Sequence, residues 1–485
     1  RHPDKTSEVC CYLIAPFLSH IFNLALVTSV FPKRMQIAKV SVLYKKGDRN
    51  EMGNYRPISI LPVFSKALEK VLHVRLTNFT NKYRLITDSQ FGFRKNRSTE
   101  AALLVQKEFI LQSFEERKIV LAVFVDFSKA FDCLDHEILL KKLYIYGIRG
   151  HALQIFRSYL EHRAQYVCLN GNSSSMKPII CGVPQGSILG PLLFNLYVND
   201  VVNINPNVKF VNYADDTTLL FSAEDSDVVV DMANLTLSRL EIWSRENSLK
   251  ININKTKAVL FRTRNKSIGI MRDITLSTTP IEIVSNFKVL GVIFSESMSW
   301  DNHINYIIPK LSRITGLLYR HRSILPTYVK LLIYNSLFYS YLNYGHLVWG
   351  STTLSNLEKI FLLQKKMLRS IGGVSFDSHT AGLFRAFRVI NIYNLYNYRL
   401  SKMFKTENNR NTHFLKNLAN LYLKEPVYPT RHAHLWEMVA RRTNYGSQMV
   451  RYTLPKLLNQ LEESELELNR ISPKQLREYF ISLDR

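Results

Sequence analysis

Three aspartates occupy positions where a folded protein would normally avoid charge. Asp126 falls in the apolar run Leu121–Phe127, and Asp215 and Asp216 follow a second apolar run, Val208–Tyr213. A lone carboxylate at the end of a buried strand is costly, and two adjacent carboxylates repel each other. A bound divalent cation reverses both penalties, because hard cations take carboxylate oxygens as ligands. Any one of these aspartates alone is better explained as a helix cap or a polar turn, so the prediction rests on their combination.

Short strands must position these carboxylates. The apolar runs predict strands at Leu121–Phe127, Val208–Tyr213 and Thr218–Ser222, and the last two should form a hairpin around a tight turn. Two-residue hairpin turns prefer Asn-Gly or other glycine-containing pairs, so adjacent aspartates are a poor structural choice there. Three carboxylates at strand ends suit a pair of Mg²⁺ ions, with Mn²⁺ as a possible substitute. One ion would activate an attacking hydroxyl and the other would stabilise the leaving group.

Periodicity predicts the remaining elements. The segment Cys11–Phe31 is strongly apolar but contains a proline and several polar residues, which favours a buried helix over a membrane anchor or signal anchor. Further strands are predicted at Lys39–Tyr44, Lys250–Ile253, Ala258–Phe261 and Val289–Phe294. Helices are predicted at Pro62–Leu76, His136–Tyr146, Ala152–Leu160, Asp225–Asn247, Leu311–Arg320, Tyr328–Tyr344 and Leu357–Ile371.

The charge balance points to a polyanionic partner. The 485 residues carry 64 Lys and Arg against 39 Asp and Glu, a formal net charge of +25. Such a surplus favours nucleic acid first and an anionic membrane second. The five cysteines are scattered and form no zinc-binding spacing, which fits a reducing compartment. We therefore expect an intracellular protein of the nucleus or cytoplasm that is neither secreted nor bound to a membrane.

Seven segments stand in a fixed order over roughly residues 30–295. They are Asn54–Ser59, Gln90–Arg94, Phe124–Asp132, Gly182–Pro191, Tyr213–Asp216 with its Tyr-Ala-Asp-Asp sequence, Leu249–Thr256 and Phe287–Phe294. In this order they resemble two finger motifs, motifs A, B, C and D and the primer-grip strand of non-LTR retrotransposon reverse transcriptases, with the closest similarity to jockey-like elements. A four-residue box is a weak signal, but seven ordered matches are very specific.

The resemblance implies roles for residues in the motifs. It assigns metal binding to Asp126, Asp215 and Asp216, in agreement with the electrostatic argument. Phe131 is similar to a steric gate whose ring would fill the space of a ribose 2′-hydroxyl, although a packed aromatic in a turn would look the same. Gln185 would contact the sugar of the incoming nucleotide, and Gly186 would let the backbone approach the template.

The basic residues of the motifs imply phosphate contacts. Arg56, with Lys45 or Lys46 on the preceding turn, would bind the triphosphate, because guanidinium and ammonium groups bind phosphates well. Arg94 would hold the template backbone, and Lys255 would protonate the leaving pyrophosphate. Basic surface residues are usually only solvated, so Lys45 and Lys46 have no expected role apart from the resemblance.

The fold class implied is α+β, a right-hand polymerase with an antiparallel palm sheet. We expect fingers and palm in residues 1–296, a helical thumb in 297–375 and a helical C-terminal extension of unknown role in 376–485. The thumb should clamp a duplex through basic residues between its apolar stripes, namely Lys310, Arg313, Arg320, Arg322, Lys330, Lys365, Lys366 and Arg369.

The implied reaction is RNA-directed DNA synthesis, in which dNMPs from dNTPs are added to a primer 3′ end. The implied partners are an RNA template, a DNA primer and the RNA–DNA hybrid that they form. Related elements commonly carry an endonuclease domain upstream, so the resemblance implies an upstream endonuclease domain that is missing from this chain. Two alternatives stay open: an RNA-dependent RNA polymerase, against which Phe131 and the Tyr-Ala-Asp-Asp box argue, and a decayed or domesticated copy that binds RNA without catalysis.

Overall fold

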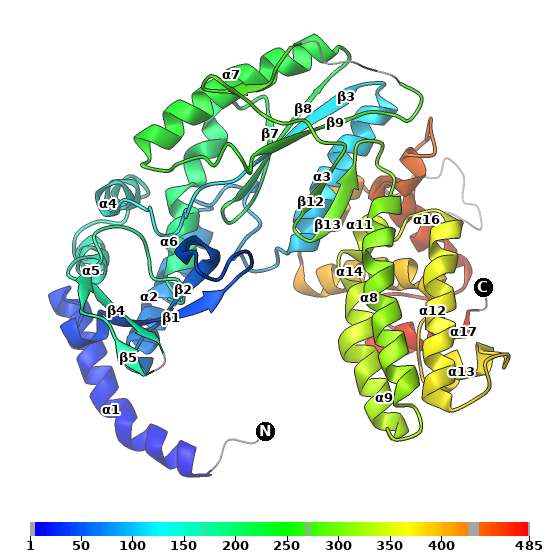
Figure 1. The fold of residues 1–485 in the computed structure, drawn as a ribbon, viewed down its shortest axis with the longest axis horizontal. Coiled ribbons are helices and arrows are strands. Elements are labelled where there is room, and N and C mark those ends of the chain that lie inside the picture. Colours follow the sequence, from blue (N-terminus) through cyan, green and yellow to red (C-terminus); the bar gives the residue numbers. More distant parts are fainter. Residues whose placement is uncertain (1–4, 170, 267, 269–271, 425–435, 484–485) are drawn as a thin grey trace.

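The computed structural model describes residues 5–169, 171–266, 268, 272–424 and 436–483. Figure 1 shows these residues as an open curve, with the N-terminal elements on one side, a central sheet at the top and a helical bundle on the other side. The fold therefore mixes helices and sheets, and the central sheet lies between the two lateral parts.

The central sheet has four strands in the order β7-β8-β3-β9, all antiparallel. The inner strand β3 is buried along its whole length, because each of its two faces packs into a different hydrophobic core. Val120, Ala122 and Phe124 face one core and the residues between them face the other, so the strand alternates between cores with the period of two that a pleated strand requires. The strands are β3 (Ile119–Val125), β7 (Lys209–Tyr213), β8 (Asp216–Ala223) and β9 (Lys257–Phe261).

Helices cover both faces of this sheet. α7 (Ser226–Glu246) packs on one face and α3 (Thr99–Glu115) on the other. The hydroxyl of Ser98 accepts a hydrogen bond from the Ala101 N–H at 3.1 Å and so caps the start of α3. Two short hairpins continue the chain beyond β9, formed by β10 (Thr275–Leu276) with β11 (Thr279–Pro280) and by β12 (Asn286–Val289) with β13 (Val292–Ser295).

A second sheet forms the side of the molecule that contains the N-terminal elements. β1 (Ile37–Tyr44) pairs antiparallel with β2 (Tyr55–Ile60) and parallel with β4 (Ala164–Leu169). Its minor strands and the helices around it are β5 (Asn172–Ser173), β6 (Lys177–Pro178), α1 (Lys5–Thr28), α2 (Val63–Lys82), α4 (His136–Ile145), α5 (His151–Leu160) and α6 (Gly190–Tyr197).

The region after Trp300 is helical, as predicted. α8 and α12 pack against each other along the bundle, and a π-helical turn at Tyr334–Phe338 joins α9 to α10. The helices of this region are α8 (Asp301–Arg320), α9 (Thr327–Ile333), α10 (Tyr339–Asn343), α11 (His346–Trp349) and α12 (Leu354–Gly372).

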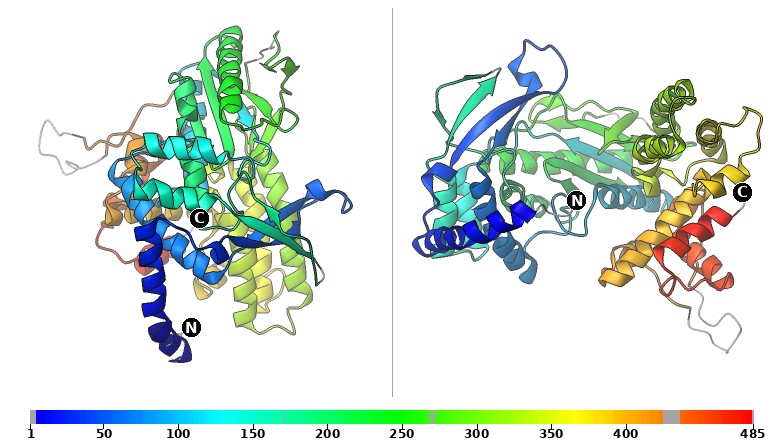
Figure 2. Two further views of the ribbon diagram at one scale, coloured as in Figure 1. Left: turned by 90° about the vertical axis from the view of Figure 1, so that its left-hand side faces the viewer. Right: turned by 90° about the horizontal axis from the view of Figure 1, so that it is seen from below.

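The C-terminal extension packs as a layer beside this bundle (Figure 2, orange to red). It also contacts α3 directly, through three glutamates spaced along that helix. The helices of the extension are α13 (Ala381–Ala386), α14 (Ile392–Arg410), α15 (Phe414–Ala419), α16 (Val450–Glu463) and α17 (Pro473–Ser482). The glutamate contacts are Glu100 with Arg399 (2.6 Å), Glu108 with the Val450 N–H (2.9 Å) and Glu115 with the Arg442 N–H (2.6 Å).

The hydrophobic core does not break at residues 296 and 375, where domain boundaries are predicted. One continuous cluster joins Phe114 of α3, Val292 of β13, Leu311 of α8 and Phe480 of α17. A chain ended near residue 296 would therefore expose the apolar side of α3 and of the central sheet. The packing does not separate the predicted domains, and their different roles stay a prediction.

Four sequence predictions are wrong in detail. The single strand predicted at Val289–Phe294 is the end of β12 and the start of β13, joined by a turn at Leu290 and Gly291. α1 is helical as expected, but it is not buried: Tyr12 and Phe17 are 82% and 72% exposed. Lys250–Ile253 is not a strand, since only Ile251 makes an isolated bridge, to Phe127. Lys330 is buried at 6% exposure, so it cannot belong to a solvent-facing basic surface. No helix in the described ranges has the length and hydropathy needed to cross a membrane.

Glu407, on α14, should make stability depend on pH. Burial raises the pKa of this carboxyl to about 7 from an ordinary 4.5. The hydrogen bond that it accepts from the Leu415 N–H acts in the opposite direction and lowers the pKa. Because the folded protein binds this proton more tightly than the unfolded chain, the free energy of unfolding should rise as the pH falls from about 8 to 4.5. Urea unfolding should find Glu407→Gln more stable than the parent at pH 8, by about 1–3 kcal/mol, and no more stable near pH 4.5.

The matched control is Glu462→Gln, because Glu462 is exposed on the same extension. Its difference from the parent should not change with pH. A difference for Glu407→Gln that is equally constant across this range would show that Glu407 ionises as an ordinary surface glutamate.

Candidate active site

The predicted hairpin exists, and its turn is strained. β7 and β8 pair with Tyr213 opposite Asp216, which leaves Ala214 and Asp215 as a two-residue turn. Ala214 has a φ of 56°, in the left-handed region that favours glycine. A non-glycine residue holds this conformation only where its surroundings enforce it.

Gln90 and Gly92 hold Ala214 in this conformation. The side-chain oxygen of Gln90 accepts hydrogen bonds from the Ala214 N–H (3.0 Å) and the Gly92 N–H (2.8 Å). A Cβ on Gly92 would lie 2.4 Å from the Ala214 nitrogen, so no larger residue fits there. The Phe91 N–H also donates to the Asn212 carbonyl at 2.7 Å. The segment expected to contact the template therefore also fixes the turn that carries Asp215.

Asp126 lies beside this turn. β3 pairs with β8 so that Val125 is opposite Thr217, and Asp126 follows at the end of the strand next to Asp216. The Oδ2 atom of Asp126 is buried without a hydrogen-bond partner in the part of the chain that the structure describes. The nearest cation is the Lys255 ammonium, with its Nζ 3.6 Å from this oxygen. The three aspartates that the sequence singled out are thus brought to one end of the sheet.

The carboxylates interact electrostatically. Burial, then the charges of Asp215 and Asp126, raise the pKa of Asp216 to about 6. Burial also raises the pKa of Asp215, with a smaller contribution from Asp126. The positive charges of Arg56 and Lys45 act in the opposite direction on Asp215. The site is therefore short of positive charge, although basic residues of the β1–β2 hairpin already reach it electrostatically.

Two basic residues of the β1–β2 hairpin act on the aspartates. Arg56 is exposed on β2, opposite Leu43 of β1, and Lys45 follows the end of β1. The charges of both lower the pKa of Asp215. Triphosphate binding by Arg56, Lys45 or Lys46 stays a prediction.

Phe131 packs between two aromatic rings. It stacks on Phe194 with ring centroids 4.3 Å apart and meets the edge of Phe93 at 6.3 Å. Its backbone carbonyl accepts a hydrogen bond from the Val183 N–H at 2.9 Å, which ties the motif A turn to the motif B loop. The ring is half-buried, so part of it faces open space.

The motif B residues are held by neighbouring protein groups. The Gln185 amide donates to both oxygens of Asp132, at 2.8 and 3.0 Å. A Cβ on Gly186 would lie 2.5 Å from the Ser59 carbonyl oxygen, so the close approach that requires glycine is to strand β2. The sequence interpretation assigned that approach to the template. The contact of Gln185 with a nucleotide sugar stays a prediction.

Arg94 points into its own loop. Its guanidinium donates to the carbonyls of Thr87 (2.6 Å) and Gln90 (3.2 Å), and burial lowers its pKa. It thereby holds the loop that positions Gln90, and template contact by Arg94 stays a prediction. Lys255 lies as expected beside the aspartates, in the loop before β9.

Similarity to known proteins agrees with this geometry. The chain is 31% identical to the RNA-directed DNA polymerase from mobile element jockey of Drosophila melanogaster, over 76% of this chain and 41% of that protein. It is 30% identical to the probable RNA-directed DNA polymerase from transposon BS of the same species, over 73% of this chain and 40% of that protein. The chain thus spans about two fifths of the length of these curated relatives.

A solved telomerase from Candida albicans, in complex with a fragment of telomeric RNA, is 12% identical. The structural match covers 80% of this chain and 63% of the telomerase chain, with a TM-score of 0.44. Residues 43–294, more than half of the chain, match the family described as reverse transcriptase (RNA-dependent DNA polymerase). The predicted resemblance to jockey-like non-LTR elements is confirmed, and the chain belongs to the reverse transcriptase family.

Proposed function

We propose that this chain is the polymerase part of a jockey-like retrotransposon protein and copies an RNA template into DNA. The observation that carries the proposal is the convergence of Asp126, Asp215 and Asp216 at one end of the central sheet, with the charges of Arg56 and Lys45 nearby. In a right-hand description, the four-stranded sheet with α3 and α7 is the palm, the β1–β2 part is the fingers and the α8–α12 bundle is the thumb.

The aspartates fit a pair of divalent cations, Mg²⁺ or Mn²⁺. Among the described residues no three His, Cys, Asp or Glu side chains already stand together as a metal-binding group. The donor chemistry nevertheless supports the assignment, because the buried Asp126 Oδ2 has no hydrogen-bond partner and the neighbouring carboxyls have raised pKa values. Divalent ions bound there would supply Lewis acidity to the primer 3′-hydroxyl and counter-charge to the departing pyrophosphate.

Other residues of the chain bind and orient the substrates. Arg56 and Lys45 bind the triphosphate of the incoming dNTP, since their charges already act on the site. Gln185, positioned by Asp132, meets the nucleotide sugar. Lys255, beside Asp126, is placed to donate a proton to the leaving pyrophosphate. The RNA template and DNA primer lie between the fingers and the thumb, a place that we call the cleft. The affinity of the protein for their hybrid should be largely electrostatic.

Primer extension tests the proposal. The full chain is incubated with Mg²⁺, an RNA template annealed to a DNA primer, and either dNTPs or rNTPs. We expect extension that requires the template and the divalent ion and that proceeds with dNTPs. Extension with rNTPs as fast as with dNTPs would replace the proposal with an RNA polymerase. Tight hybrid binding without any extension would mean a catalytically dead copy.

Phe131→Val should weaken the selection against ribonucleotides. The free part of the ring fills the volume that a 2′-hydroxyl would need, so a smaller side chain removes a clash without removing a contact to dNTPs. The dNTP over rNTP preference should fall by at least about tenfold, or about 1.4 kcal/mol of discrimination. Single-nucleotide addition rates with matched dNTP and rNTP measure it.

The control is Phe194→Leu, which removes the same stacking contact by changing the other ring of the pair. It should lower stability to a similar degree and leave sugar selection intact. Equal loss of selection in both variants would show that Phe131 acts only through packing.

A further inference from the structure

A groove lies between the C-terminal halves of α8 and α12, at the end of the bundle away from the central sheet (Figure 1). Its volume is about 540 Å³. Gly316 forms part of its wall, and a Cβ built at that position meets no atom within 4 Å, so the missing side chain widens the groove. The residues that matter most in the wall are Gly316, Tyr319, Arg322, Lys366, Arg369 and Phe376.

The charge of the groove is entirely positive. Arg322, Lys366 and Arg369 line it, and no carboxylate among the described residues does. The two arginines are already oriented, since Arg322 donates to the Tyr319 carbonyl (2.8 Å) and Arg369 to the Ser378 carbonyl (2.9 Å). Lys366 is exposed. The charge of Arg369 also acts on Asp377, the residue after Phe376. With three cations in its wall the groove keeps a net positive charge, which favours an anionic ligand.

Two exposed aromatic rings stand beside these cations. Tyr319 is 54% exposed and Phe376 is 73% exposed. The Arg322 guanidinium lies 3.9 Å from the centroid of Tyr319, and that of Arg369 lies 5.6 Å from the centroid of Phe376. Exposed rings next to phosphate-binding cations are typical of single-stranded nucleic acid sites, because unpaired bases stack on rings and a duplex keeps its bases inside.

The groove is separate from the surface proposed to clamp the duplex. Tyr306 and Lys310, spaced four apart, lie on one face of α8. At 100° per residue, Gly316 and Tyr319 lie roughly 100° and 160° around the helix from that face. The Lys310 ammonium is 3.7 Å from the Tyr306 ring, and Lys288 of β12 donates to the Tyr306 hydroxyl at 2.6 Å. This cluster joins α8 to the hairpin next to the sheet, whereas the groove is at the far end.

We propose that the groove between α8 and α12 is a second nucleic-acid site that holds a single strand while the cleft holds the RNA–DNA hybrid. Arg322, Lys366 and Arg369 contact its phosphates, and bases stack on Tyr319 and Phe376. The inference rests on the proposed function for the hybrid in the cleft. The strand is either template RNA outside the hybrid or single-stranded DNA, and both present phosphates and unpaired bases.

Gly316→Glu tests the site. The added side chain has room, improves helix propensity and places a negative charge in the groove. The full chain is first saturated with a short RNA–DNA hybrid, and a fluorescent RNA of about 10 nucleotides is then titrated by anisotropy. The parent should bind it with a log–log salt slope of about −2, as expected for three phosphate contacts. Gly316→Glu should weaken this binding at least about tenfold.

Two further variants separate the groove from the cleft. Phe376→Ala, at an exposed position, should weaken the binding of the single strand by about tenfold, because a base loses its stacking partner. The affinity for the hybrid should stay unchanged. Lys310→Glu, on the opposite face of α8 from Tyr319, should do the reverse. A DNA strand of the same length identifies the source: tighter RNA binding indicates template RNA, and equal or tighter DNA binding indicates single-stranded DNA. Either outcome supports the groove.

Three results would overturn the proposal. These are no single-strand binding once the hybrid is saturating, unchanged binding in Gly316→Glu, or equally tight binding of an acidic peptide of matched charge. Extension on a template that overhangs the primer by a single nucleotide should be the same in Gly316→Glu and the parent. Failure of the parent in that extension assay contradicts the polymerase proposal, whereas the titration judges the groove alone.

Discussion

Asp215→Asn should abolish primer extension while the protein still folds and binds its hybrid. Asparagine keeps the shape of the side chain and removes one of the three charges available to bind divalent cations. We expect the extension rate to fall by at least about a thousandfold, or about 4 kcal/mol of barrier. Folding should not suffer, because burial and the neighbouring Asp126 already raise the pKa of this carboxyl, and a neutral side chain relieves that repulsion.

The control for this variant is Asp231→Asn. Asp231 is on the surface of α7 and pairs with Arg272 at 2.9 Å, far in sequence from the turn. Rapid-quench extension should find its rate within about twofold of the parent, since exposed ion pairs contribute little. An Asp215→Asn rate within about tenfold of the parent would remove this carboxylate from the catalytic site.

The sequence predicts the positions of the carboxylates well because the signal is local. An apolar run that ends in Asp126, and another that ends just before Asp215, specify two buried strands with charge at their ends. β3 and β7 both flank β8 in the central sheet. The antiparallel register of β3 with β8 places Asp126 beside Asp216, and this long-range pairing is a property of the fold that the local pattern does not specify.

The support of the turn could not be predicted in this way. The side-chain oxygen of Gln90 accepts a hydrogen bond from the Ala214 N–H, although the two residues are far apart in the sequence. Gly92 leaves the space that this contact needs. Sequence patterns identified the segment but assigned it to the template. A glycine that follows a glutamine has no distinctive periodicity, so only the three-dimensional contact reveals this role.

Exposure was the least predictable property. Hydropathy favoured a buried helix at the N-terminal end, yet Tyr12 and Phe17 of α1 face solvent in the described chain. Lys330 shows the opposite error, since a charged residue between apolar neighbours is buried. Local periodicity specifies that a helix forms, but what covers each face depends on the packing of remote elements.

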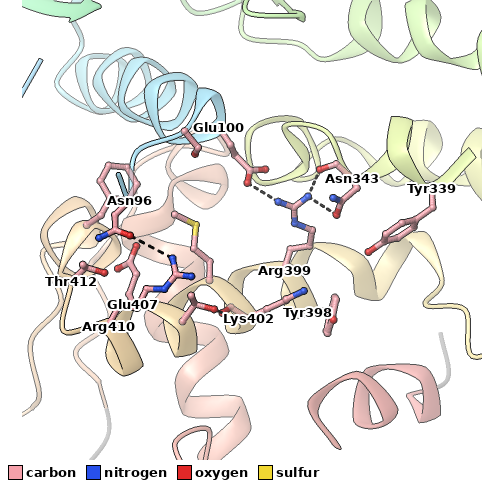
Figure 3. A pocket seen from close by; sticks show the side chains of 14 residues that line it. Asn96, Glu100, Tyr339, Asn343, Tyr398, Arg399, Lys402, Glu407, Arg410 and Thr412 are labelled. Atoms are coloured by element: carbon pink, nitrogen blue, oxygen red, sulfur yellow. Dashed lines mark hydrogen bonds and ion pairs between the residues drawn. The ribbon is translucent and has the colours of Figure 1, made fainter. Parts of the chain in front are cut away.

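Arg399 should be the most important single residue of the extension for stability. Figure 3 shows its guanidinium between Glu100 of α3 and Asn343 of α10, so one side chain joins three parts of the fold. Arg399 and Glu100 are only 18% and 14% exposed. Burial raises the pKa of Glu100, and Arg399 and the Leu347 N–H lower it. Arg399→Met should therefore lower the free energy of unfolding by about 3–5 kcal/mol, because it leaves a buried carboxylate without its cation.

A double-mutant cycle measured by urea unfolding separates this pair from simple packing. Adding Glu100→Gln to Arg399→Met removes the unpaired charge and should restore most of the lost stability. Lys402→Met is the matched control, because Lys402 lies one turn further along α14, faces the same pocket and makes only a distant contact, 5.9 Å from the Tyr398 ring. Its effect should stay within about 0.5 kcal/mol. If Arg399→Met costs no more than Lys402→Met, the extension is held to α3 and α10 by its apolar core alone, and the buried ion pair adds nothing to the junction.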